Sequence, residues 1–203
     1  MPKHDFTTGV VTKADAAPLL AQYHYLTGVS RGFKSGFNVG LHWQGDLVGV
    51  CIFTGFPVPE LVVGAFGLDR RDQAGFWELS RLVLRPDVQA SEHNLAGWFI
   101  AKAINRLRLA NPVRAILSYA DADHHTGTVY RATGFVCYGK TDSKADFWIT
   151  QPDGTHIKHS RGPTKGVAGE WRKRSQKHRY LKIFDPSLTV QWRKEQLELE
   201  KTE

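Results

Sequence analysis

The chain has 203 residues with a formal net charge of +7, and 41% of its residues are hydrophobic. These values are ordinary for a folded protein and favour one domain with an appendage. No apolar run reaches the roughly 18–20 residues of a membrane span, and the first residues lack the apolar stretch of a signal peptide, which excludes the membrane and secreted classes. Cys51 and Cys137 lie inside apolar runs and are interpreted as core residues, so we expect a cytoplasmic protein.

The positive charge is concentrated near the C-terminus. Between Lys158 and Lys182 the chain has nine Lys or Arg residues and one acid, Glu170, so the rest of the chain is near neutral. A solvated protein surface usually mixes both signs of charge, and this segment does not. The segment therefore predicts a polyanionic partner.

Hydrophobic periodicity and turn residues predict alternating strands and helices. A strand over residues 9–12 and a helix over 14–25 come first, followed by a Gly- and Ser-rich loop. The other expected elements are, in chain order, a hairpin of strands over 37–43 and 47–56, a strand over 76–84, a polar loop over 87–93, a helix over 95–109, a strand over 113–119, a short helix ending near Gly134, a strand over 135–138, and a second hairpin over 147–150 and 155–158.

This order predicts an α/β fold with a mixed, mostly antiparallel central sheet and helices on both faces. We expect residues 1–160 to form the catalytic domain and residues 161–203 to form a basic C-terminal extension, packed on that domain or extending it. In the strand over 76–84, strict alternation predicts that Leu79, Arg81 and Val83 share one face. On this strand Arg81 could either pair with Glu78 or contact a phosphate.

The middle of the chain resembles the GNAT acyltransferase superfamily. Residues 78–86 (ELSRLVLRP), followed by a loop and a helix from Asn94, carry the resemblance. It implies that the strand pairs with the pantetheine arm of acetyl-CoA or a related acyl-CoA, and that the helix N-terminus holds the pyrophosphate, where free N–H groups favour an anion. The residues implied for cofactor binding are Arg81, Leu82, Val83, Ser91 and Asn94.

Three other stretches are similar to the phage Mom-type DNA modification proteins, a divergent GNAT branch. They are residues 118–135 (SYADADHHTGTVYRATGF), residues 23–26 (YHYL) and the basic ending at 176–181 (QKHRYL). The resemblance implies an enzyme that places a methylcarbamoyl (carbamoylmethyl) group on the exocyclic amine of adenine in phage DNA. Such a modification protects the DNA from host restriction.

The candidate catalytic residues in these stretches are His24, Tyr25, Asp121 and Tyr130. An imidazole ordinarily titrates near neutral pH, so His24 could act as a base or a ligand, although a His at a helix end also favours the helix dipole. Asp121 is expected just after a central strand, where α/β proteins place their sites, and where it could equally cap the next helix. Tyr130 could protonate a leaving thiolate, or pack against the sheet.

Two points stay open. Ser118 and Tyr119 are adjacent on a strand, so only one of them can face the site. His124 and His125 could bind a metal together with His24 and Asp121, but their spacing matches no recognised ligand pattern.

The basic segment also contains aromatic residues, among them Trp171 and Tyr180. Cations interleaved with aromatic rings suit phosphate contacts and base stacking, so we expect double-stranded DNA as the partner. The expected DNA-binding residues are Arg172, Lys173, Arg174, Lys177 and Arg179.

The predicted function is a DNA-modifying, acyltransferase-like enzyme that hypermodifies adenine. One alternative is an ordinary acetyl-CoA-dependent N-acetyltransferase, for which the loop over 87–94 lacks the expected glycines. The other is a non-catalytic DNA-binding protein on the same scaffold. The oligomeric state is left open, with a homodimer among the alternatives.

Overall fold

The computed structural model describes residues 3–24, 33–159 and 162–195. The elements in chain order are η1 (Lys3–Asp5), β1 (Phe6–Val10), α1 (Lys13–Tyr23), β2 (Phe37–Trp43), β3 (Asp46–Gly55), α2 (Glu60–Phe66), β4 (Phe76–Leu84), α3 (Pro86–Ser91), α4 (Leu95–Ala110), β5 (Ala115–Asp121), α5 (Thr128–Ala132), β6 (Val136–Lys140), β7 (Ala145–Thr150), β8 (His156–Lys158), β9 (Gly169–Lys173) and β10 (Lys177–Ile183).

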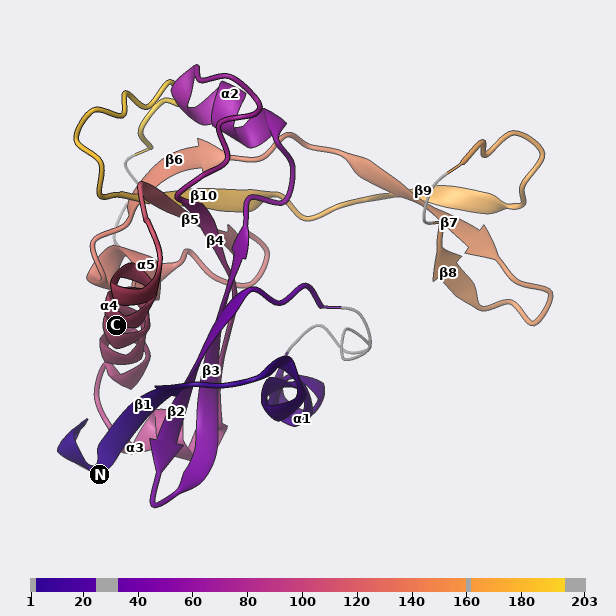
Figure 1. Cartoon of the computed structure of the whole chain (residues 1–203). Helices are drawn as coiled ribbons and strands as arrows, with labels where there is room; N and C mark the ends of the chain where they lie inside the picture. Colours follow the sequence, from indigo (N-terminus) through magenta and orange to yellow (C-terminus); the bar gives the residue numbers. More distant parts are fainter. Residues whose placement is uncertain (1–2, 25–32, 160–161, 196–203) are drawn as a thin grey trace, which may run out of the picture.

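A seven-stranded sheet in the order β1-β2-β3-β4-β5-β10-β6 forms the centre of the fold (Figure 1). Neighbouring strands are antiparallel except β4 and β5, which are parallel. α1 packs on one face of the sheet and α4 on the other. The structure thus confirms the predicted mixed, mostly antiparallel sheet with helices on both faces.

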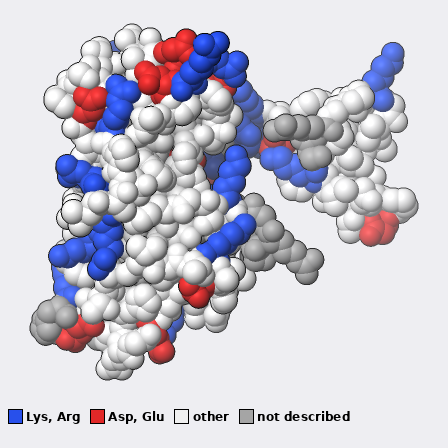
Figure 2. All heavy atoms as spheres, in the orientation of Figure 1, with Lys and Arg blue, Asp and Glu red and all other residues white. Residues whose placement is uncertain are grey.

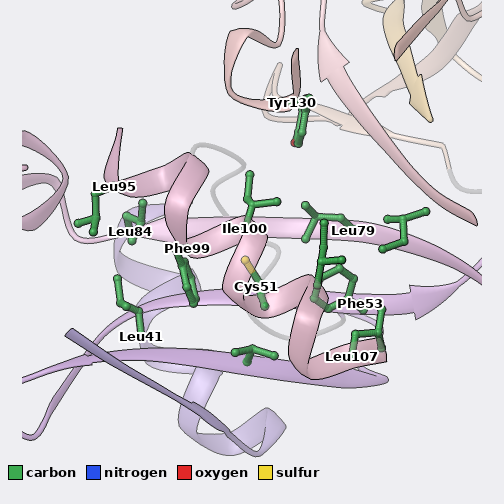
Figure 3. Packing of buried hydrophobic residues seen from close by; sticks show 14 of the residues in the cluster. Leu41, Cys51, Phe53, Leu79, Leu84, Leu95, Phe99, Ile100, Leu107 and Tyr130 are labelled. Atoms are coloured by element: carbon green, nitrogen blue, oxygen red, sulfur yellow. The ribbon is translucent and has the colours of Figure 1, made fainter. Parts of the chain in front are cut away.

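The main hydrophobic core lies between α4 and the sheet (Figure 3). α4 buries a stripe at helical spacing that includes Leu95, Phe99, Ile100 and Leu107, as its periodicity predicts. Each of these side chains contributes about 1.5–3 kcal/mol to folding relative to an exposed position. None of the helices in the described ranges is long and apolar enough to cross a lipid bilayer.

β4 and β5 pair over only three residues before they diverge. Their last paired residues are Glu78 and Leu117, although β4 continues to residue 84 and β5 to residue 121. We call the place where they diverge the fork. The fork matters because it opens the middle of an otherwise continuous sheet.

β4 also has an extra residue beside the fork. Ile52 of β3 pairs with Arg81 and Phe53 pairs with Leu79, so Ser80 is unpaired in a β-bulge. The bulge shifts the alternation of side chains by one position. The expectation that Leu79 and Val83 share one face is therefore wrong: Leu79 packs in the core on the α4 side and Val83 in the core on the α1 side.

Several elements differ from the sequence-based expectations. α2 was not expected, and α3 forms where a polar loop was predicted. Pro86 occupies the first turn of α3, where its fixed φ suits a helix, and Val88 is fully buried. The basic segment contains two strands, β9 and β10, where no strand was expected, and β10 lies between β5 and β6 in the central sheet.

A second sheet, in the order β8-β7-β9, projects from the body of the protein (Figure 1). We call residues 145–173, which contain it, the arm. The predicted hairpin of β7 and β8 is confirmed, and β9 adds a third strand on the other side of β7. Within the described part of the arm, Phe147 is the one buried side chain. The arm thus buries little apolar surface of its own.

Candidate active site at the fork

A cavity of about 570 Å³ lies at the fork. It exists because β4 and β5 diverge there, so no strand fills the space between them. The cavity is lined by His24, residues 78–82 of β4, Tyr119 of β5, residues 124–130 of the following loop and α5, and Lys177 at the start of β10. Polar groups from five separate elements therefore meet in one place.

His24 reaches the cavity from the C-terminal end of α1, where its N–H donates to the carbonyl of Leu20 at 3.1 Å. Burial, with the positive charges of Arg81 and Lys177, lowers the pKa of His24 to about 4. At neutral pH the imidazole is therefore uncharged and able to accept a proton. Tyr25, the other catalytic candidate from this stretch, lies outside the described residues.

Glu78 is a site residue that the sequence analysis did not single out as catalytic. It is the last residue of β4 paired with β5, which places it at the fork. Burial raises the pKa of its carboxyl, although the charges of Arg81, Lys177 and Lys34 oppose this shift. Together with Ser80 and Arg81, Glu78 also lines a neighbouring cavity of about 190 Å³. Only the pairing register of the strands reveals this position.

Tyr119, and not Ser118, lines the cavity. Burial and the nearby charge of Glu78 raise the pKa of the Tyr119 phenol to about 12, so it stays a hydrogen-bond donor at neutral pH. The hydroxyl of Ser118 instead donates to the carbonyl of Leu79.

Tyr130 lines the cavity from α5, and its ring is 92% buried against Phe135 and Tyr180. The turn before α5 requires a glycine, because Gly127 has φ +78° and a Cβ there would lie 2.5 Å from the Tyr180 ring. The Tyr180 hydroxyl donates to the carbonyl of Thr126. These contacts fix the position of the Tyr130 ring at the cavity wall.

Asp121 is the last residue of β5, not the residue after it, and it is not among the residues that line the cavity. Its carboxylate accepts hydrogen bonds from the Ser175 hydroxyl and the Asp123 N–H. Burial acts to raise the pKa of Asp121, but these hydrogen bonds outweigh it and lower the pKa. The structure thus brings His24 and Tyr130 to one cavity and places the Asp121 carboxylate in the adjoining turn.

The predicted cofactor residues fall into two groups. Arg81 and Leu82 line the cavity, whereas the Val83 side chain is buried on the α1 side of the sheet. Ser91 ends α3, where its hydroxyl donates to the carbonyl of Val88, and Asn94 precedes α4 with a left-handed φ of 53°. Ser91 and Asn94 therefore lie just before the first residue of α4, outside the cavity lining.

The predicted DNA-binding residues do not form one tail. Arg172 and Lys173 belong to β9 of the arm, and Arg174 follows it. Lys177 lines the cavity, and the Arg179 guanidinium lies 4.4 Å from the Trp192 ring centre. On the face seen in Figure 2, Lys and Arg side chains lie on the arm and on the part of the body next to it. Insertion of β10 into the sheet causes this separation, because it carries Lys177, Arg179 and Lys182 into the body.

The metal ligands considered from the sequence are not grouped together in the described residues. The close group of potential ligand atoms found there is a different one, formed by Cys137, His178 and Glu195.

The fold is similar to that of solved acetyltransferases. A GNAT family acetyltransferase from Elizabethkingia anophelis with acetyl-CoA bound is similar at a TM-score of 0.54 and 10% identity, over 90% of this chain and 100% of that chain. The ribosomal-protein-S18-alanine N-acetyltransferase from Escherichia coli is similar at a TM-score of 0.51 and 12% identity, over 87% and 92%. A Bacillus subtilis acetyltransferase in complex with CoA gives a TM-score of 0.50 and 12% identity, over 88% and 97%.

The fold is therefore that of the GNAT acetyltransferases. Comparison with curated proteins found no significant match. Residues 5–201 match the model of the Mom protein family, and the chain belongs to that family.

Proposed function

We propose that this protein is a GNAT-fold enzyme that modifies adenine bases in DNA, with an acyl-CoA bound at the fork. The observation that carries the proposal is the cavity in which a carboxyl, three imidazoles and two phenols meet. Membership of the Mom family supports the DNA substrate, and acetyl-CoA and CoA in the similar acetyltransferases support the cofactor. The product we propose is a methylcarbamoyl (carbamoylmethyl) adenine that protects phage DNA from restriction. Acyl transfer from the thioester, with CoA thiolate as the leaving group, gives only an N6-acyl adenine, so this product requires a nitrogen-containing co-substrate in addition to the acyl-CoA.

The exocyclic amine of adenine is a poor nucleophile, because its lone pair is delocalised into the ring. The enzyme must therefore extrude the base from the duplex and assist removal of a proton from the amine. We assign that proton to Glu78, with the neutral His24 beside the same cavity as the second acceptor. We propose that the base enters through the smaller cavity, which Glu78 also lines.

Tyr130 is assigned to the cofactor side of the cavity. A phenol has an ordinary pKa near ~10 and can donate a proton to a thiolate as it leaves. The backbone of β4 beyond the fork, with Arg81 and Leu82 in the cavity lining, is proposed to contact the pantetheine arm. The N-terminus of α4 is proposed to hold the pyrophosphate.

The arm is proposed to hold the duplex beside the cavity. Trp171 is 63% exposed, and the Arg172 guanidinium stacks 5.0 Å from the centre of the Trp148 ring. Exposed rings beside cations suit contacts to bases and phosphates. At the root of the arm, Lys140, Lys173 and Arg174 line a cavity of about 370 Å³.

Mass spectrometry of nucleosides from cells that express the protein tests the proposal. A modified deoxyadenosine that is absent with the Glu78→Gln variant is the expected result. An acetylated small amine or protein, with unmodified DNA, would identify an ordinary N-acetyltransferase. DNA binding by the purified protein without any modified nucleoside and without acyl-CoA binding would identify a non-catalytic DNA-binding protein.

A further inference from the structure

A second cluster of reactive side chains lies at the edge of the central sheet, apart from the cavity at the fork. Cys137 comes from β6, His178 from β10 and Glu195 from the segment that follows β10. The Cys137 Sγ and the His178 Nδ1 each lie 3.6 Å from Oε2 of Glu195. All three ligand atoms lie within 4.8 Å of one another. The proposed function uses none of them.

The cluster is built into the fold. His178 and Cys137 are 4% and 5% exposed, and the N–H of Glu195 donates to the carbonyl of Cys137 at 3.0 Å. The Nδ1 atom of His178 is buried and makes no hydrogen bond with the described residues. Buried polar atoms are nearly always satisfied, so such an atom indicates a missing partner.

A metal ion fits between these atoms. Ligands bound tetrahedrally at about 2.0–2.3 Å from one zinc ion are separated by roughly 3.3–3.7 Å, which matches the two separations of 3.6 Å. Thiolate, imidazole and carboxylate are all zinc ligands.

We propose that Cys137, His178 and Glu195 bind a structural Zn²⁺ ion, with water as the fourth ligand. The thiolate and the carboxylate balance the charge of the ion, and Arg179, Arg193 and Lys194 line a neighbouring cavity together with Glu195. The ion would join the chain after β10 to β6 and β10. Tyr180, which packs in the same core cluster as Cys137, contacts the cavity loop through Thr126. The ion would therefore stabilise the position of Tyr180 and, through it, the loop that lines the active-site cavity.

Titration of the full-length protein with Co²⁺ tests the site without measuring activity. The protein is stripped of metal with a chelator under reducing conditions and titrated with Co²⁺ and then Zn²⁺. We expect one Co²⁺ per chain, with the visible bands of a tetrahedral site and a near-ultraviolet thiolate-to-cobalt band, both removed by Zn²⁺. Cys137→Ser should lose the thiolate band and Glu195→Gln should shift binding to higher Co²⁺ concentration. Cys51→Ala, which changes the other cysteine, should retain the spectrum.

Two results would overturn the proposal. One is the absence of stoichiometric Co²⁺ or Zn²⁺ binding by the wild-type protein. The other is an unchanged spectrum in Cys137→Ser or, where that variant does not fold, unchanged affinity in Glu195→Gln, whose side chain is 36% exposed and tolerates substitution. Failure of this test leaves the proposed adenine modification unaffected, because that activity is measured in separate assays.

Discussion

The hydroxyl of Ser118 donates a 2.9 Å hydrogen bond to the carbonyl oxygen of Leu79, one residue beyond the last paired residues of β4 and β5. Ser118 is fully buried. The side chain thus links the two strands where their backbone pairing ends. It defines the inner limit of the cavity at the fork.

Ser118→Ala should lower the free energy of unfolding by about 1–3 kcal/mol, because it leaves the buried carbonyl of Leu79 without this donor. Chemical denaturation measures the change. Ser187→Ala is the control: its hydroxyl bonds Asp185 in an exposed turn, so we expect a change within about 0.5 kcal/mol. Equal losses in the two variants would show that Ser118 does not hold the fork.

Glu78→Gln should abolish the modified nucleoside while leaving the fold intact. Burial raises the pKa of Glu78 in the folded protein. Above the ordinary pKa of 4.5 the unfolded chain therefore binds fewer protons than the folded protein, and the wild type loses stability as pH rises. The variant should therefore be at least as stable as wild type at pH 7, and this advantage should disappear below pH 4.5. Thermal unfolding across this range measures it. An active Glu78→Gln enzyme would remove Glu78 from the chemistry.

His24→Asn should change the acid side of the stability profile. The pKa of His24 is about 4 in the folded protein against an ordinary 6.5, so the unfolded state gains a proton first as pH falls. The stabilisation that results from this pKa difference of His24 is complete above pH 6.5 and is lost as the pH falls from 6.5 to 4. Wild type should lose more stability than the variant across that window. Parallel profiles for the two proteins would contradict the buried, neutral imidazole. Loss of the modified base in this variant would assign His24 to the reaction.

Replacing Arg172, Lys173 and Arg174 with Ala should weaken DNA binding and reduce its dependence on salt concentration, since fewer counterions are released. Fluorescence anisotropy with a short duplex at several salt concentrations measures both quantities. A charge-matched control replaces Lys102, Arg106 and Arg108 on the exposed side of α4. A similar loss in both triple variants would mean that net charge, and not the arm, determines the affinity.

The sequence predicted the sheet and α4 well, because their periodic apolar residues reflect burial that the structure retains. β2 and β4 have the predicted bounds, and α4 differs from its prediction by one residue at its end. The bulge at Ser80 could not be predicted, because it depends on how β4 pairs with β3. The same limit hid Glu78, whose position at the fork depends on pairing with β5.

β9 and β10 were missed for a different reason. Lys and Arg make up five of their twelve residues, and such a density of charge is typical of a solvated surface. In β10, however, His178, Tyr180 and Leu181 are buried, while Arg179 rests on Trp192. The high density of charge concealed a strand that has an ordinary buried face.

The position of β10 between β5 and β6 has a consequence for synthesis of the chain. β5 shares only three paired residues with β4, and its other edge pairs with β10. That edge therefore has no partner until residues 177–183 have left the ribosome. Until then an apolar strand presents unpaired backbone groups, which are prone to join other chains. Nascent chains that stop before β10 should therefore be captured by chaperones or aggregate, and the active-site cavity should form only after residues 177–183 have been synthesised.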